Sequence, residues 1–182
     1  RVAEKYIGFA EKLGCRLIRV FTGKVGSAEA DEKTYLQGVR GLRHICGMGK
    51  DKGLLFVLET HPGSLMDTGP ATLRLLKDVS MDNLKVNLQV PLDGGREDVV
   101  YDSARMLGEH VIHIHAHNWI GSWPNFTFLG QGDYDFKKFV GILHEKGFDG
   151  YISIEHGKHS GLTPLEVAKR EIEYLKAEII GG

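Results

Sequence analysis

Residues 110–118 read HVIHIHAHN, a stretch in which polar and apolar side chains alternate. Because successive side chains of a β-strand point to opposite faces, His113, His115 and His117 share one face and the residues between them share the other. A strand covered by helices on both faces of an open parallel sheet is usually apolar throughout. The alternation therefore predicts one face packed against helices and a polar second face, as in the mouth of a β-barrel.

Three other predicted strands become polar on one face toward their carboxyl ends. The polar residues on these faces are Glu59 in residues 53–60, Asn87 and Gln89 in residues 84–90, and Tyr151, Ser153 and Glu155 in residues 150–156. Local hydrogen bonding could account for any one of them. A carboxylate, an amide, an imidazole and a second carboxylate on four successive strands are better explained by one shared site.

Strands and helices alternate along the whole chain. The predicted strands are residues 16–21, 53–60, 84–90, 110–118 and 150–156, and the predicted helices are residues 2–13, 30–49, 70–78, 95–107, 135–147 and 163–179. This alternation implies right-handed crossovers and a parallel sheet in one α/β domain, residues 1–182. The polar inner face indicates a (β/α)8 TIM barrel, which takes about 250 residues. We expect its first three βα units to be absent from this chain, which starts within a helix.

Composition argues against several classes of protein. The 182 residues carry a formal net charge of −1, and the sequence has no run of Lys or Arg that would indicate a nucleic-acid partner. No apolar stretch approaches the roughly 18 residues of a membrane span, and the first residues do not resemble a signal peptide. We therefore predict a cytoplasmic protein with a small-molecule partner. Sheet edges left open by an incomplete barrel would favour pairing with another chain, so we also predict a homo-oligomer.

Glu59, His115 and Glu155 are candidate ligands of a metal ion. Carboxylates and an imidazole in a barrel mouth suit divalent Mn²⁺, Mg²⁺, Co²⁺ or Zn²⁺. Two carboxylates on one cation can also flank a sugar carbon, so that one removes a proton and the other returns it, while the metal polarises the adjacent carbonyl. Glu59 and Glu155 are therefore the predicted catalytic residues.

Four segments together resemble the xylose isomerase-like TIM barrels, a superfamily of sugar-phosphate isomerases and epimerases. They are EKLGCRLIRVFTG, GLLFVLETHPGSLMDTG, HVIHIHAHN and LGQGDYDFKKFVGILHEKGFDGYISIEH, of which the last is the longest and most specific. The resemblance covers essentially the whole chain. It implies a metal held by Glu, Asp, His and Glu, and the corresponding residues here are Glu59, Gln89, His115 and Glu155.

The chain departs from the family pattern at four positions. Gln89 stands where an aspartate is usual, so it can offer a neutral carbonyl oxygen as a ligand, but one negative charge is lost. Leu92 stands where the family has a histidine that contacts substrate, and His117 and Asn118 stand where lysine and aspartate are common. We therefore expect weaker metal binding or a changed reaction.

Residues 118–134, NWIGSWPNFTFLGQGDY, form the one long irregular stretch of the chain and are rich in aromatic residues. After a barrel strand such a loop emerges at the catalytic face. Its rings could seal the barrel mouth or pack on a partner chain, or Trp119 or Trp123 could stack on the apolar face of a sugar. The predicted substrate-binding residues are His61, His113, His117, Asn118, Trp119 and Trp123.

These residues support several functions. The first is a metal-dependent isomerase or epimerase of a keto-sugar or sugar phosphate, which transfers a proton through an enediolate. An inosose-type dehydratase could use the same groups to eliminate water. A DNA-repair endonuclease is less compatible, because it needs more His and Asp ligands and a more basic surface. The fourth possible function is that of a non-catalytic homologue with a decayed site. Gln89 and Leu92, which replace the usual aspartate and histidine, support it. Metal content measured together with activity would separate an enzyme from a decayed homologue.

Overall fold

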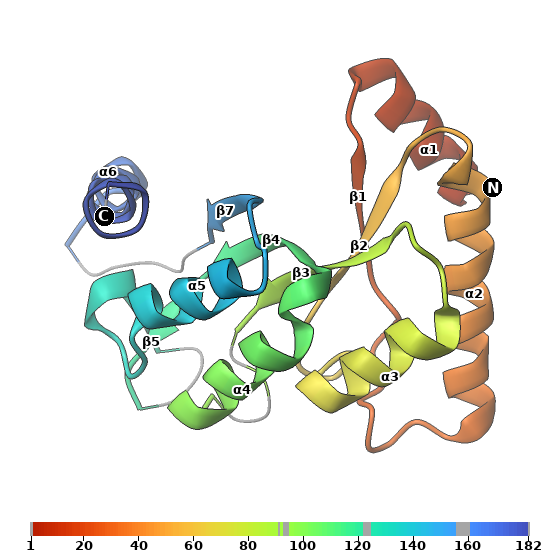
Figure 1. Cartoon of the computed structure of the whole chain (residues 1–182), viewed down its shortest axis with the longest axis horizontal. Coiled ribbons are helices and arrows are strands. Elements are labelled where there is room, and N and C mark those ends of the chain that lie inside the picture. The colour runs from red at the N-terminus through yellow and green to blue at the C-terminus, as the bar shows by residue number, and fades with distance from the viewer. Residues whose placement is uncertain (1, 91, 93–94, 122–124, 156–160, 182) are drawn as a thin grey trace.

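The computed structural model describes residues 2–90, 92, 95–121, 125–155 and 161–181, and its centre is a curved parallel sheet (Figure 1). The strands are β1 (Leu17–Val20), β2 (Leu55–Glu59), β3 (Leu84–Gln89), β4 (Val111–Ala116) and β7 (Tyr151–Ile154), in that order across the sheet. Each neighbouring pair is parallel. The five predicted strands are thus confirmed, with ends that differ from the prediction by at most two residues.

Helices connect the strands, and α2 to α5 follow one side of the sheet (Figure 1). The helices are α1 (Val2–Leu13), α2 (Glu32–Lys50), α3 (Gly69–Val79), α4 (Glu97–Leu107), α5 (Phe136–Glu145) and α6 (Pro164–Leu175), which continues into a π-helical turn, η3 (Lys176–Ile180). Side chains in the connections fix where several helices begin. Asp31 accepts a hydrogen bond from the Thr34 amide at the start of α2, and Thr163 and Glu166 form a reciprocal capping box at α6.

The hydrophobic core lies between the helices and the outer face of the sheet. Most outward side chains of the three central strands are almost completely buried: the exposed fractions are 2% or less for Phe56, Leu58, Val86, Leu88 and Ile114. Residues of the opposite parity, which include Glu59, Gln89 and His115, lie on the inner face. The alternation of polar and apolar residues in the sequence therefore corresponds to the division between the outer face, which packs on the core, and the inner face.

A short antiparallel hairpin replaces the end of the predicted strand 110–118. β5 (Asn118–Trp119) pairs with β6 (Phe126–Thr127), and a 3₁₀ turn, η2 (Leu129–Gln131), follows, while another, η1 (Gly108–His110), precedes β4. The Asn118 side-chain nitrogen donates to the carbonyl oxygens of Leu129 and Tyr134 at 2.7 and 2.9 Å. These bonds satisfy buried backbone groups and turn the chain away from the direction of β4.

Both edges of the sheet are open in the part of the chain that the structure describes. β1 and β7 are the outermost strands, and Tyr151 on β7 is 75% exposed. Helix α1 also exposes the apolar side chains of Val2, Tyr6, Phe9 and Leu13. These surfaces agree with the predicted homo-oligomer, which stays a prediction. Among the described helices, none is both long and apolar enough to span a membrane.

The contact between Gly132 and Asn118 offers a test of the hairpin. A Cβ atom at Gly132 would lie 1.9 Å from the Asn118 side-chain oxygen. Gly132→Ala should therefore displace Asn118 from its two carbonyl partners and lower the free energy of unfolding by about 1–3 kcal/mol, measured by urea denaturation. Gly141→Ala in α5 is the control, because a Cβ there meets nothing within 4 Å. Equal stabilities for the two variants would contradict the anchoring role of Asn118.

Glu171 on α6 makes the stability of the hairpin depend on pH. The residue is 1% exposed, and its side chain accepts a hydrogen bond from the Leu129 amide at 3.1 Å. Burial raises the pKa of Glu171 from 4.5 to about 7, despite the opposing effect of that hydrogen bond. The folded state thus binds the proton more tightly, so this carboxyl destabilises the fold increasingly as pH rises from about 4.5 to 7.

Replacement of Glu171 by glutamine should remove this dependence. Glu171→Gln keeps a carbonyl acceptor for the Leu129 amide but carries no charge, so we expect the variant to be more stable than the wild type at pH 8 by about 1–2 kcal/mol. The difference should vanish near pH 4. Urea denaturation at the two pH values measures it, with the exposed Glu173→Gln as control. A variant less stable than the wild type at pH 8 would refute this explanation.

Candidate functional site

Glu59, His115 and Glu155 converge at the carboxyl ends of three strands. Glu59 ends β2, His115 lies near the end of β4, and Glu155 directly follows β7. One ligand atom from each residue lies within 4.8 Å of the other two. The predicted convergence of the three side chains is confirmed. Their role as metal ligands stays a prediction.

The imidazole of His115 is at the centre of this group. Its Nδ1 atom lies 2.6 Å from Glu59 Oε1 and 3.2 Å from Glu155 Oε2. The nitrogen is buried and, among the described residues, is not aligned for a hydrogen bond with any partner. Ligand atoms bound at right angles to one cation at about 2.1 Å lie about 3 Å apart. The donor set and its spacing therefore fit a divalent cation.

Gln89, at the end of β3, completes the group from the strand between β2 and β4. If its amide nitrogen faces the carboxylates, it lies 3.1 Å from both Glu59 Oε1 and Glu155 Oε2 and donates to each. If its carbonyl oxygen faces them instead, the amide is oriented as a neutral ligand of a shared cation. Thr60 Oγ1 fixes the backbone here, because it donates to the Gln89 carbonyl at 2.7 Å and accepts from the Gln89 amide at 2.8 Å.

Arg19 is a site residue that the sequence-based prediction missed. Its Nη1 atom donates to both oxygens of Glu59, at 2.9 and 2.7 Å. Burial alone would raise the pKa of Glu59, but the His115 contact and the Arg19 charge outweigh it and lower that pKa below its ordinary value. Arg19 lies on the inner face of β1 within the apolar segment RLIRVF, and this parity was the available signal.

His113 and His61 lie beside the group without joining it. His113 Nε2 is 2.8 Å from Ser153 Oγ, and its ring packs edge-on against His115 with centroids 5.6 Å apart. Burial and the charge of His115 lower the pKa of His113. The His61 ring packs edge-on against Phe21 at 5.4 Å. Their predicted contacts with substrate stay predictions.

His117 is buried against Glu155. Its Nε2 atom lies 3.0 Å from Glu155 Oε2, and its ring stacks on Phe126 of β6 with centroids 5.2 Å apart. Burial lowers the pKa of His117, while the adjacent Glu155 opposes that shift. The side chain is only 4% exposed, which favours a contact with Glu155 over the predicted contact with substrate.

The predicted substrate contacts of Asn118 and Trp119 disagree with their burial. Both residues are 1% exposed. The polar side-chain atoms of Asn118 form hydrogen bonds with backbone groups of the hairpin and of the residues that follow it. The Trp119 ring packs on Tyr134 with centroids 5.1 Å apart. Trp119 therefore packs in the core, a position that neither interpretation of this loop expected, and the predicted contact with a sugar does not fit this burial. Trp123 lies outside the described residues.

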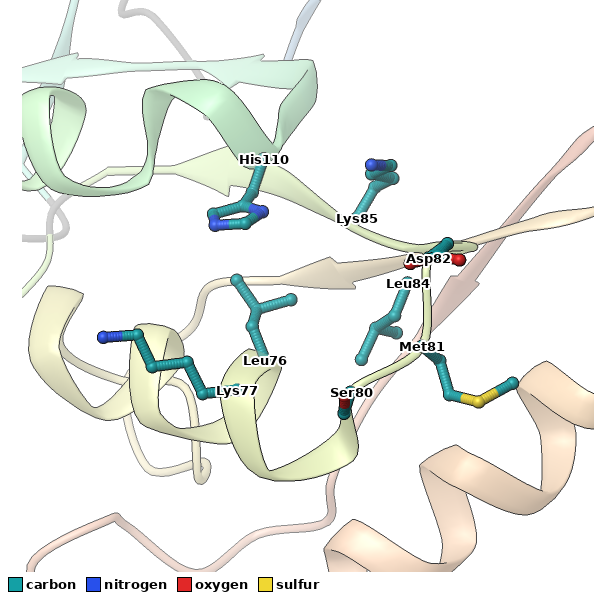
Figure 2. Close-up of a pocket in the computed structure, with 8 residues that line it drawn as sticks. All are labelled: Leu76, Lys77, Ser80, Met81, Asp82, Leu84, Lys85 and His110. Atoms are coloured by element: carbon teal, nitrogen blue, oxygen red, sulfur yellow. The ribbon is translucent and has the colours of Figure 1, made fainter.

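A separate hollow of about 360 Å³ lies at the other end of the sheet, where β3 and β4 begin (Figure 2). Its wall includes Lys77, Lys85 and His110. Burial lowers the pKa of His110, and the charges of Lys85 and Lys77 lower it further, against the effect of Glu109. Because these residues lie at the amino ends of the strands, the hollow does not belong to the carboxylate group.

Comparison with known proteins identifies the family. Residues 1–178 match the xylose isomerase-like TIM barrels, and the chain belongs to this family. The 3-dehydroshikimate dehydratase of Bacillus anthracis is 37% identical over 103 residues, or 56% of this chain and 36% of that protein. An inosose dehydratase of Clostridium perfringens is 25% identical over 181 residues, or 86% of this chain and 58% of that protein. The chain thus spans about a third to just over half of these relatives.

Solved structures share the fold. The probable 3-dehydroshikimate dehydratase from Bacillus anthracis has a TM-score of 0.80 and 25% identity over 96% of this chain and 68% of its own. An L-ribulose 3-epimerase, a D-psicose 3-epimerase and a zinc-bound protein have TM-scores of 0.73 to 0.79 at 15 to 18% identity, over 96 to 99% of this chain and 66 to 69% of theirs. The relatives therefore include both dehydratases and epimerases.

The role of Gln89 can be tested through its charge. Gln89→Asp places a charged oxygen at a position that is 4% exposed, so it should tighten Mn²⁺ binding about tenfold, measured by isothermal titration calorimetry. Gln89→Asn is the matched control, because it shortens the side chain equally but stays neutral. If Gln89→Asp and the wild type bind Mn²⁺ with equal affinity, Gln89 is not a ligand.

Proposed function

We propose that this site moves a proton at a carbon next to the carbonyl group of a polyhydroxylated substrate, with the help of a divalent cation. The observation that carries the proposal is the convergence of Glu59, His115 and Glu155 within 4.8 Å. The three side chains, with the carbonyl oxygen of Gln89, would hold the cation. Carboxylate, imidazole and amide ligands suit Mn²⁺, Mg²⁺, Co²⁺ or Zn²⁺.

Two carboxyl groups on different strands give the site an acid and a base. The lowered pKa of Glu59 keeps it ionised and able to accept a proton from carbon. The cation would polarise the substrate carbonyl and stabilise the negative charge that the departing proton leaves behind. Glu155, which has a half-exposed side chain, would deliver a proton to the neighbouring carbon in an isomerase or to the opposite face of the same carbon in an epimerase.

A dehydratase is a second candidate, and the sequence relatives favour it. A stretch of 103 residues is 37% identical to a 3-dehydroshikimate dehydratase, and an inosose dehydratase aligns over 86% of this chain. The first step is the same removal of a proton next to a carbonyl. Glu155 would then protonate a departing hydroxyl on the adjacent carbon, so that a carbon–carbon double bond and one water molecule form. A ring ketone with a β-hydroxyl group is the matching substrate class.

Reactions in D₂O distinguish the two outcomes. We expect the protein with Mn²⁺ to act on one member of a set containing keto-sugars, their phosphates, an inosose and 3-dehydroshikimate. An isomerase or epimerase product can carry solvent deuterium at carbon and has the mass of its substrate apart from that label. A dehydratase product is one water lighter and absorbs in the ultraviolet through its conjugated double bond.

Substitution of the carboxylates provides the control. Glu59→Gln and Glu155→Gln should each lower kcat/KM by at least about a hundredfold, because each removes a proton-transfer group. The exposed Glu145→Gln should leave it unchanged. Turnover that survives in both variants, or a protein that neither binds Mn²⁺ nor acts on any substrate of the set, would refute the proposed function and favour a non-catalytic homologue.

A further inference from the structure

His117 is held on three sides. Its side chain is 4% exposed and its Nε2 atom lies 3.0 Å from Glu155 Oε2. Its ring stacks on Phe126 with an angle of 24° between the planes. The Tyr134 hydroxyl donates to the His117 backbone carbonyl. Both the ring and the backbone of His117 therefore have a defined position before any ligand binds.

The Glu155 side chain is held by polar contacts and much less by burial than that of Glu59. It follows the last residue of β7, and its amide makes the last bond of the ladder, to the Ala116 carbonyl at 3.2 Å. Its side chain is 47% exposed, whereas that of Glu59 is 3% exposed and bound by Arg19. An exposed glutamate can adopt many rotamers, so its carboxylate faces the site only if neighbours hold it there. Three side chains approach its Oε2 atom: His115 Nδ1 at 3.2 Å, the Gln89 amide nitrogen at 3.1 Å where it faces the carboxylates, and His117 Nε2 at 3.0 Å. Of these, His117 is the one outside the proposed set of metal ligands.

We propose that His117 is a positioning residue, which holds the Glu155 carboxylate toward Glu59 and His115 and is itself held by Phe126. This inference rests on the proposed function, because it assigns to His117 the orientation of one of the two acid/base groups. It also gives the β5–β6 hairpin a role. A displacement of Phe126 would loosen His117 and, through it, Glu155.

The first test needs neither metal nor substrate. Long-range ¹H–¹⁵N NMR records the ring nitrogens of each histidine, and these signals respond to the hydrogen bonds of the ring. We expect Glu155→Gln and Phe126→Leu each to shift the His117 signals. His144 provides the internal control, because it stacks on Phe148 at 6.0 Å and 17° on a different part of the surface. His117 signals that do not move in Glu155→Gln would overturn the proposal.

The second test separates positioning from substrate contact. His117→Phe keeps a ring on Phe126 but loses the donor, so Mn²⁺ affinity and kcat should each fall about tenfold or more while KM changes little. His117→Gln keeps a donor near the position of Nε2 and should recover part of both losses. His144→Phe, the same substitution elsewhere, should behave as the wild type. If His117→Phe also loses its native circular dichroism spectrum, Mn²⁺ affinity, kcat and KM are measured on His117→Gln and Phe126→Leu instead.

The outcomes for the two proposals differ. The positioning role would be overturned if His117→Phe kept the Mn²⁺ affinity and the kcat of the wild type, or if its KM rose while kcat stayed unchanged. Either result would leave the proposed function intact. A wild-type protein that neither binds Mn²⁺ nor turns over any substrate would refute the proposed function. In that case the NMR result alone decides whether His117 holds Glu155.

Discussion

Two carboxylates beside one imidazole nitrogen impose the strongest constraint in this molecule. Their oxygens lie 2.6 and 3.2 Å from His115 Nδ1, and negative charges so close to one another raise the energy of the site unless positive charge is near. Arg19 provides one such charge, 2.7 Å from Glu59. A divalent cation among Glu59, His115 and Glu155 would provide two more positive charges. Because Gln89 is neutral, the site has one negative charge fewer to compensate than it would with an aspartate at this position.

The fold meets this constraint because the two faces of its sheet differ: the outer face packs on the helices and the inner face has the charged residues. The outer side chains of β2, β3 and β4 are buried under the helices, which leaves the inner side chains free to be polar. Parallel pairing brings all carboxyl ends to one edge of the sheet, so residues far apart in the sequence become neighbours. The hairpin then adds support from outside the sheet through Phe126 and His117.

Strand periodicity explains why much of the site could be predicted from the sequence. Alternation of polar and apolar residues identified the inner face, and with it the neighbourhood of Glu59, Gln89 and His115. Arg19 shares that parity but was missed, because the parity of a single arginine in a four-residue strand is a weak signal. The burial of Trp119 was not predictable either, since residue type does not reveal whether an aromatic ring in a loop covers the core or faces a ligand.

The proposed reaction begins at a carbon beside a carbonyl group, and it depends on a cation bound where the carboxylates of Glu59 and Glu155 meet His115. The direct measurement is the anomalous diffraction of crystals soaked in Mn²⁺ at the manganese absorption edge. We expect one peak about 2.2 Å from ligand atoms of Glu59, His115 and Glu155. A peak only at other residues, or none at millimolar Mn²⁺, would contradict it.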